Sequence, residues 1–174
     1  MKLYEFEGKQ LLQEAGIKIP EGYVIENQEE IQTPTEEVVI KAQTLEGKRG
    51  KAGFIKAAKT KEEIETITKQ LINKHHGFET VKKLLIETKC KIKNEFYLAI
   101  TYDTRTRNPA IIASNQGGVD IEETKNIHPS KVIIEQINIL NGITEHEAKQ
   151  ILHKAGITNL HMIPLLQKLY NLFM

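Results

Sequence analysis

Residues 38–56 read VVIKAQTLEGKRGKAGFIK, and they decide the fold that the sequence predicts. The first three residues are β-branched and favour a buried strand, which Lys41 then interrupts with an ammonium on one face. A glycine-spaced loop follows, and glycines let a backbone approach a ligand and present its amides to an anion. The same loop carries three cations that supply charge for phosphate oxygens: Lys48, Arg49 and Lys51. The stretch therefore predicts two strands joined by a flap that holds phosphate.

A solvated hairpin is the alternative interpretation of this loop. Basic loops that contain glycine are common, and composition alone leaves that alternative open. A Walker A loop is excluded, because that motif needs four residues between its first Gly and its Gly-Lys pair, followed by Ser or Thr. Here only two residues separate Gly47 from Gly50, and Ala52 follows Lys51. The loop is therefore not that of a P-loop NTPase.

The composition is that of an ordinary globular chain: 174 residues, 40% hydrophobic and 27% charged. The formal net charge is +1, so no global field directs the chain to nucleic acid or to a membrane. No apolar run approaches the ~18 residues of a membrane span. Cys90 is the only cysteine, which excludes an intramolecular disulfide and fits a reducing cytosol. We therefore expect a cytoplasmic protein.

Several further elements are predicted from periodicity and end signals. Residues 3–15 predict an amphipathic helix that ends at Gly16. A capping box of Thr60 and Glu63 predicts a helix that runs to Gly77, with His75 and His76 solvated in its last turn. Strands are predicted at 23–25, 84–86, 95–103 and 110–114, the last two as an antiparallel hairpin, and 131–134 is a further candidate. Thr144 and Glu147 predict another capped helix, and a last apolar helix begins near Pro164.

Three motifs carry a resemblance to a known family. KAQ at 41–43, followed by GKRGKAG at 47–53, resembles the nucleotide loop of the β subunit of succinyl-CoA synthetase, an ATP-grasp ligase. LYEFEGKQLL at 3–12 and GIKIPEGY at 16–23 are similar to that family's N-terminus. SNQGGVDIE at 114–122 resembles its Ser-x-x-Gly-Gly-Val-Glu-Ile-Glu signature. The resemblance implies an α/β (α+β) ATP-grasp fold with two subdomains, the second of them truncated.

The resemblance also implies a division into lobes. We expect residues 20–103 to form the nucleotide-binding lobe, and residues 1–19 with 104–174 to form a second, incomplete ATP-grasp lobe. Two or three strands carrying several apolar helices make a marginal sheet with an open edge. An exposed edge or apolar patch is therefore expected near the last helix, with the strand 110–114 exchanging its amides faster than 38–41.

Nucleotide-binding residues follow from the same resemblance. Lys41 matches the lysine that reaches the nucleotide phosphates from its strand. The flap over the phosphates is matched by Lys48, Arg49 and Gly50, although the family usually has Gly where this chain has Lys48. Two glutamates eight residues apart, Glu87 and Glu95, match the hinge that holds purine and ribose, and Cys90 falls where the family uses a backbone contact. From the residues alone, the favoured interpretation of the two glutamates is a pair of surface acids, and no catalytic residue is assigned.

Cofactors and partners are implied by the resemblance as well. It implies ATP or ADP, with Mg²⁺ to neutralise charge during phosphoryl transfer, and metal ligands expected beyond Met174. It implies an α subunit that carries the phosphohistidine and the CoA site, in the succinate–CoA ligase reaction of the tricarboxylic acid cycle. We expect this chain to be either a separately encoded fragment that a partner chain completes or an excised piece of a β subunit. We expect the isolated chain to be inactive.

Two competing functions remain open at this point. The chain is alternatively a non-catalytic ATP-grasp remnant that acts as a binding or assembly module. RNA binding through the basic segment 48–61 has little support, because stacking aromatics are needed beside the charge and only Phe54 is present there. We therefore expect neither nucleic acid nor a membrane as partner.

Overall fold

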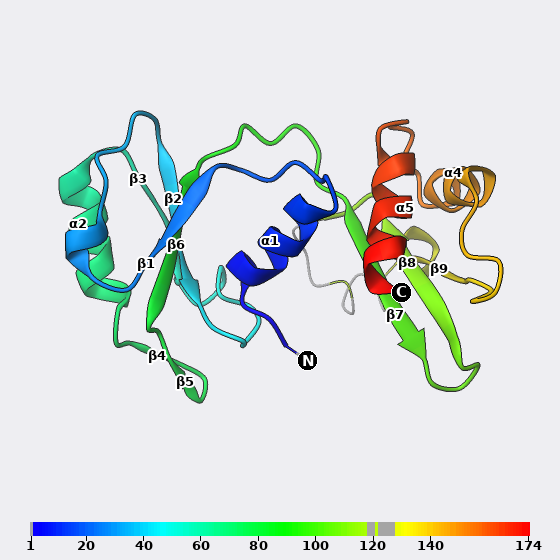
Figure 1. Cartoon of the computed structure of the whole chain (residues 1–174), viewed down its shortest axis with the longest axis horizontal. Coiled ribbons are helices and arrows are strands. Elements are labelled where there is room, and N and C mark those ends of the chain that lie inside the picture. Colours follow the sequence, from blue (N-terminus) through cyan, green and yellow to red (C-terminus); the bar gives the residue numbers. More distant parts are fainter. Residues whose placement is uncertain (1, 118–120, 122–127) are drawn as a thin grey trace. The chain divides into compact units, whose positions relative to one another are not determined.

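The computed structural model describes residues 2–117, 121 and 128–174. The chain divides into two compact units (Figure 1), and each is described by itself. The first unit comprises Met1–Glu14 and Lys18–Lys91, and the second comprises Ala15–Ile17 and Ile92–Met174. Part of the SNQGGVDIE motif, residues 118–120 and 122, lies outside the described residues.

The first unit is built on a four-stranded sheet with the order β1-β6-β2-β3, in which all neighbours are antiparallel. Its strands are β1 (Gly22–Ile25), β2 (Val38–Gln43), β3 (Ile55–Ala58) and β6 (Lys83–Thr88). The helix α2 (Lys61–Leu71) packs against β2 and β3, and the 3₁₀ helix η1 (Gln28–Glu30) lies between β1 and β2. The predicted hairpin of two strands around the basic loop is thus present as β2 and β3.

The two faces of this sheet differ because side chains alternate along each strand. Ile40 of β2 and Ile86 of β6 are fully buried in a core with Ile64 and Leu71 of α2. Lys41 and Glu87 are the next residues along the same strands, so they project from the opposite face. They lie diagonally across the ladder, since Val39 pairs with Glu87 and Lys41 with Leu85. The sheet therefore has one apolar face and one face that carries opposite charges.

The predicted end of α2 was wrong. The helix ends at Leu71, and Asn73 then turns the chain with a φ of 63°. The two histidines form the strand β4 (His75–His76), which pairs with β5 (Glu79–Thr80). His76 is not solvated but buried: its Nδ1 lies 2.9 Å from the Thr44 hydroxyl, and its ring lies 4.7 Å from that of Phe54. The ring therefore packs under the end of the basic loop.

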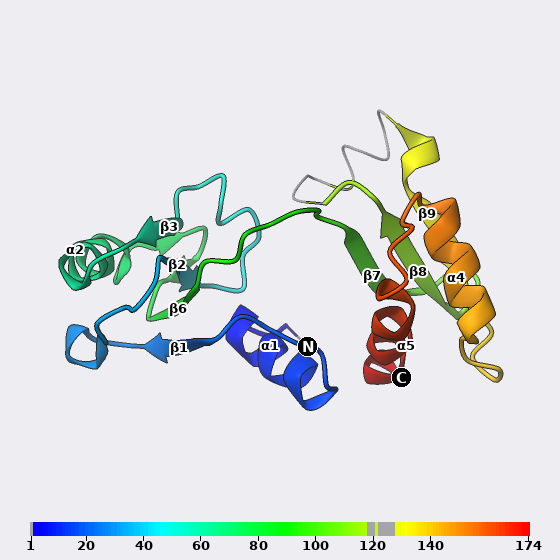
Figure 2. The same cartoon turned by 90° about the horizontal axis from the view of Figure 1, so that it is seen from above.

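The second unit is a three-stranded antiparallel sheet covered by helices. Its strands, in spatial order, are β7 (Tyr97–Asp103), β8 (Asn108–Ser114) and β9 (Ile133–Gln136). The 3₁₀ helix η2 (Pro129–Lys131) precedes β9. The helices α4 (Glu145–Lys154) and α5 (Met162–Phe173) pack on each other and share one core with the sheet. Figure 2 shows both helices beside the sheet. Thr144 and Glu147 form the predicted capping box of α4.

The division of the chain differs from the predicted one at two places. Residues 92–103 fall in the second unit and not the first, and β7 within them pairs along its whole length with β8. The first helix, α1 (Glu5–Glu14), falls in the first unit and not the second, because its side chains bond to β2 and β6. The predicted position of the open edge also changes. Strand 110–114 belongs to the central β8, with partners on both sides, so the outer strands of the described sheet are β7 and β9.

Candidate functional site

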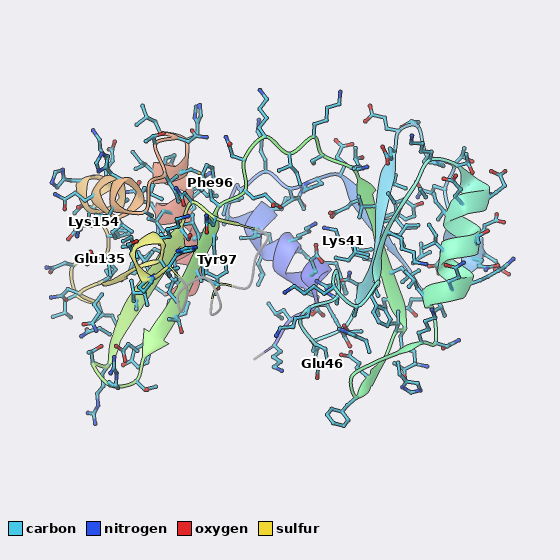
Figure 3. The ribbon with its side chains drawn as sticks, turned by 180° about the vertical axis from the view of Figure 1, so that it is seen from behind. Lys41, Glu46, Phe96, Tyr97, Glu135 and Lys154 are labelled. Atoms are coloured by element: carbon cyan, nitrogen blue, oxygen red, sulfur yellow. The ribbon has the colours of Figure 1, made fainter. Side chains whose placement is uncertain are left out.

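A cluster of five charged side chains lies on the polar face of the first unit's sheet. Glu5 and Lys9 stand one turn apart on α1 and face the sheet together. Lys41 comes from β2, Glu87 from β6 and Arg49 from the basic loop. Figure 3 shows Lys41 beside α1. Three secondary structure elements and one loop thus deliver charges to one place.

The contacts within this cluster are close and direct. The Lys41 ammonium lies 2.5 Å from Oε1 of Glu87 and 2.9 Å from Oε1 of Glu5. Lys9 bonds to Oε2 of Glu87 and lies 3.2 Å from Oε1 of Glu5. Arg49 donates from Nη2 to Oε2 of Glu5 at 2.7 Å and from Nη1 to the Ala42 carbonyl at 2.7 Å. Each Glu5 oxygen therefore serves at least one cation, and the two oxygens together bridge a strand and a loop.

The members of this cluster are largely removed from water. The Glu87 side chain is 6% exposed, and those of the other four are between 17% and 20% exposed. Charges at that depth interact strongly, because less solvent screens them. The cluster holds three cations and two carboxylates, so it carries an excess of one positive charge.

The protonation states follow from these contacts. Burial raises the pKa of Glu5, but the hydrogen bond from Lys41 and the charges of Lys41, Lys9 and Arg49 outweigh it and lower the pKa to about 2. Burial lowers the pKa of Lys41, but its hydrogen bonds to Glu87 and Glu5 outweigh burial and raise it above the ordinary lysine value. Both groups are therefore ionised at neutral pH.

The basic loop has a defined backbone. Its later amides are used inside the loop: Ala52 donates to the Lys48 carbonyl, Gly53 to Gly50, and Phe54 to Arg49. Gly53 has a φ of 77°, which glycine adopts without strain. Lys48 has a φ of 64°, in the left-handed region that favours glycine. The amides of Ala52, Gly53 and Phe54 are therefore not available to an anion in this conformation.

The predicted site residues fall into three groups: three lie in the cluster, two others lie in the basic loop, and two lie in neither. The structure brings Lys41, Arg49 and Glu87 together in the cluster. Gly50 is exposed in the loop that holds Arg49, and Lys48 precedes it there. The other two predicted residues are not part of the cluster. Cys90 is exposed with its thiol 3.9 Å from the Thr88 carbonyl, and Glu95 is exposed and belongs to the second unit.

Two members of the cluster, Glu5 and Lys9, were not predicted as site residues. Both residues lie in the segment LYEFEGKQLL, four residues apart. An acid and a base at that spacing on a helix usually form an exposed surface pair, so the spacing alone does not indicate a site. Only the tertiary contacts of α1 with β2 and β6 show that both side chains join the site.

The chemistry of this donor set fits an anion. Lys41 has three donors and Arg49 has five, of which the described contacts to Glu5, Glu87 and Ala42 use two on each side chain. The carboxylates of Glu5 and Glu87 are each bonded to two or more cations, so they do not fit a magnesium site. Two cavities, of about 350 Å³ and about 390 Å³, adjoin Glu87 and have the size of small-molecule pockets.

Comparisons with known proteins agree with a nucleotide-binding fold. A family model described as an ATP-grasp domain matches residues 2–174. The β subunit of succinate–CoA ligase [ADP-forming] from Methanocaldococcus jannaschii is 36% identical over 178 residues, covering 99% of this chain and 49% of the relative. The corresponding subunit from Methanothermobacter thermautotrophicus is 38% identical over 181 residues, with the same coverage. This chain thus spans about half the length of the curated relatives that it matches.

Solved structures show the same fold at lower identity. PH1788 from Pyrococcus horikoshii superposes with a TM-score of 0.72 at 20% identity, covering 98% of this chain and 76% of that chain. The dinucleotide-forming acetyl-coenzyme A synthetase 1 of Ca. Korarchaeum cryptofilum, solved with coenzyme A, acetyl-coenzyme A and a phosphorylated phosphohistidine segment, superposes with a TM-score of 0.71 at 16% identity. It covers 98% of this chain and 79% of that chain. Among the described helices of this chain, none is long and apolar enough to cross a membrane.

Proposed function

This chain belongs to the ATP-grasp domain family, and on that premise we propose that its first unit binds the phosphates of ATP or ADP through the charge cluster. The resemblance to succinyl-CoA synthetase β subunits and the mixed α/β ATP-grasp fold that the sequence predicted are both confirmed. The nucleotide itself and the roles of single residues are proposals.

The convergence of Lys41 and Arg49 on one carboxylate carries this proposal. The two cations come from a strand and from a glycine-spaced loop, and the two oxygens of Glu5 bridge them. Phosphate oxygens bind the same donors in the same bridging manner, and the guanidinium and ammonium groups are suited to several oxygens at once. In this proposal Lys41 and Arg49 hold phosphate, while Lys48 and Gly50 supply the loop that covers it.

The remaining predicted residues have secondary roles in the proposal. Glu87 fixes Lys41 from the sheet and adjoins two cavities, to which we assign the rest of the nucleotide. Cys90 offers its backbone and Glu95 its carboxylate to the purine and ribose, as the family resemblance implies. Mg²⁺, when bound, neutralises charge on phosphate oxygens. We assign none of the described residues to it, because both cluster carboxylates are saturated by cations.

We also propose the wider setting of this site. The relatives cover nearly all of this chain at 36% and 38% identity, and their printed name is that of an ADP-forming ligase subunit. The proposed role is therefore the nucleotide-binding part of a succinate–CoA-ligase-type β subunit in the cytoplasm. Its proposed partner is an α subunit that carries the phosphohistidine and the CoA site. Thioester formation in a reconstituted complex with that subunit is the test of this wider setting.

Calorimetric titration with ADP in the presence of Mg²⁺ tests nucleotide binding. Replacing Lys41 with alanine removes a charge-assisted contact, which costs on the order of 1.5–3 kcal/mol, or roughly a tenfold to hundredfold loss of affinity. Lys69→Ala is the matched control, because Lys69 is an exposed lysine of the same unit on α2, which packs on the apolar face of the sheet. Equal affinity of the wild type and Lys41→Ala would show that the site is misassigned.

A further inference from the structure

The Glu5 carboxylate occupies the donors that the proposed function assigns to phosphate. Its Oε1 accepts from Lys41 at 2.9 Å, and its Oε2 accepts from Arg49 at 2.7 Å. A ligand phosphate that bridges Lys41 and Arg49 as Glu5 does needs the two donors that Glu5 now uses, and the charge of Glu5 opposes an anion on the donors that remain. The two anions therefore compete, and the structure shows the cluster with the protein's own anion in place.

The helix that carries Glu5 is attached to the sheet mainly by polar contacts. None of the ten residues of α1 is buried, and none belongs to the apolar core of the first unit. Besides the ion pairs of Glu5 and Lys9, the Phe6 amide donates to Gln43 of β2, and the hydroxyl of Tyr4, just before the helix, donates to Glu79 of β5. Glu5 is the first residue of this helix. Withdrawal of its carboxylate therefore removes no side chain from the core.

We propose that Glu5 is a built-in counter-anion, which neutralises Lys41 and Arg49 when no ligand is bound and which nucleotide phosphates displace. This inference rests on the proposed function and adds a regulatory contact to the same site. Displacement leaves Lys9 paired with Glu87, so one ion pair continues to hold α1 to the sheet. Glu5 thereby sets the affinity, because each bound phosphate has to replace a carboxylate that is already bonded to both cations.

The test is ADP and inorganic pyrophosphate binding to the Glu5→Gln variant. Glutamine keeps the size of the side chain and removes its charge, so the excess positive charge of the cluster rises from one to two. We expect about tenfold tighter binding of both ligands than in the wild type. Glu14→Gln is the matched control, because Glu14 is an exposed glutamate on the same helix. Equal or weaker binding by folded Glu5→Gln would overturn the inference.

The outcomes separate this inference from the proposed function. If the wild type binds, Lys41→Ala binds less and Glu5→Gln binds no better, the nucleotide site stands and the counter-anion does not. If neither the wild type nor Glu5→Gln binds ADP or pyrophosphate, both proposals are wrong.

A second measurement on the wild type decides the question if Glu5→Gln does not fold. In protein labelled with ¹³C at glutamate carboxyl carbons, ADP should move the Glu5 signal and leave the Glu14 signal in place. An unmoved Glu5 signal at saturating ADP would overturn the inference.

Discussion

Replacing Glu5 with glutamine should lower the stability of the first unit at neutral pH and remove part of its acid sensitivity. The folded-state pKa of Glu5 is about 2, against an ordinary value of 4.5. The carboxylate therefore stabilises the folded state fully above pH 4.5, and this stabilisation is lost as the pH falls through 2. The difference between these two pKa values corresponds to at most about 3 kcal/mol in the free energy of unfolding. Because a fifth of the side chain is exposed, we expect about 2–3 kcal/mol at pH 7.

The assay is urea unfolding at several pH values between 7 and 2, followed through the amide signals of β2 and β6. These signals report the first unit alone, so the stability of the second unit does not enter. The difference between wild type and Glu5→Gln should be largest at pH 7 and should shrink towards zero near pH 2. Glu14→Gln, the exposed control on the same helix, should change little at any pH. A difference that is absent at pH 7, or that stays constant down to pH 2, would refute the assigned electrostatics.

Three other predictions concern the scaffold that positions the site. Gly22→Ala should destabilise the first unit by about 1–3 kcal/mol in urea unfolding, because the added Cβ would lie 2.6 Å from the Ile86 carbonyl oxygen and 2.7 Å from Glu87 Cβ. An unchanged free energy of unfolding would contradict that packing. Thr44→Val should cost about 1–3 kcal/mol by the same assay, because it leaves a buried His76 nitrogen without its partner, and an unchanged midpoint would show that the bond contributes little. In hydrogen exchange, β8 amides should be protected more strongly than those of β7, since β8 has a partner strand on each side; equal protection would mean that the edge of β7 is covered.

Much of the fold was predictable because it depends on local patterns. The β-branched run of β2, the alternation of Leu98 and Ile100 in β7, and the capping box at Thr144 are signals that tertiary structure did not overrule. The end of α2 was not predictable in this way. Lys74, His75, His76 and Gly77 resembled the end of a helix, but they follow the helix, which ends at Leu71, and belong to a hairpin. The left-handed turn at Asn73 that separates the two has no strong sequence signature.

The site was predictable in part, for a related reason. Lys41 and Arg49 lie within a motif whose glycines and charges are contiguous in sequence, so the motif itself indicates an anion. Glu5 and Lys9 are distant from that motif and join it only because α1 lies against the polar face of the sheet. An acid and a base four residues apart describe a surface pair on most helices. The pairing of a helix with a sheet face is tertiary information that the spacing does not contain.

The most direct test of the central claim, that the cluster holds nucleotide phosphates, observes the two cations themselves. In ¹⁵N-labelled protein, the Lys41 ammonium and Arg49 guanidinium signals are followed while ADP is added with Mg²⁺. Lys69 and Arg105, which are exposed and lie outside the cluster, serve as internal controls. We expect saturable shifts of the Lys41 and Arg49 signals together, with little change at the two controls. Saturable ADP binding that leaves both cluster signals unmoved, or no binding at all, would contradict it.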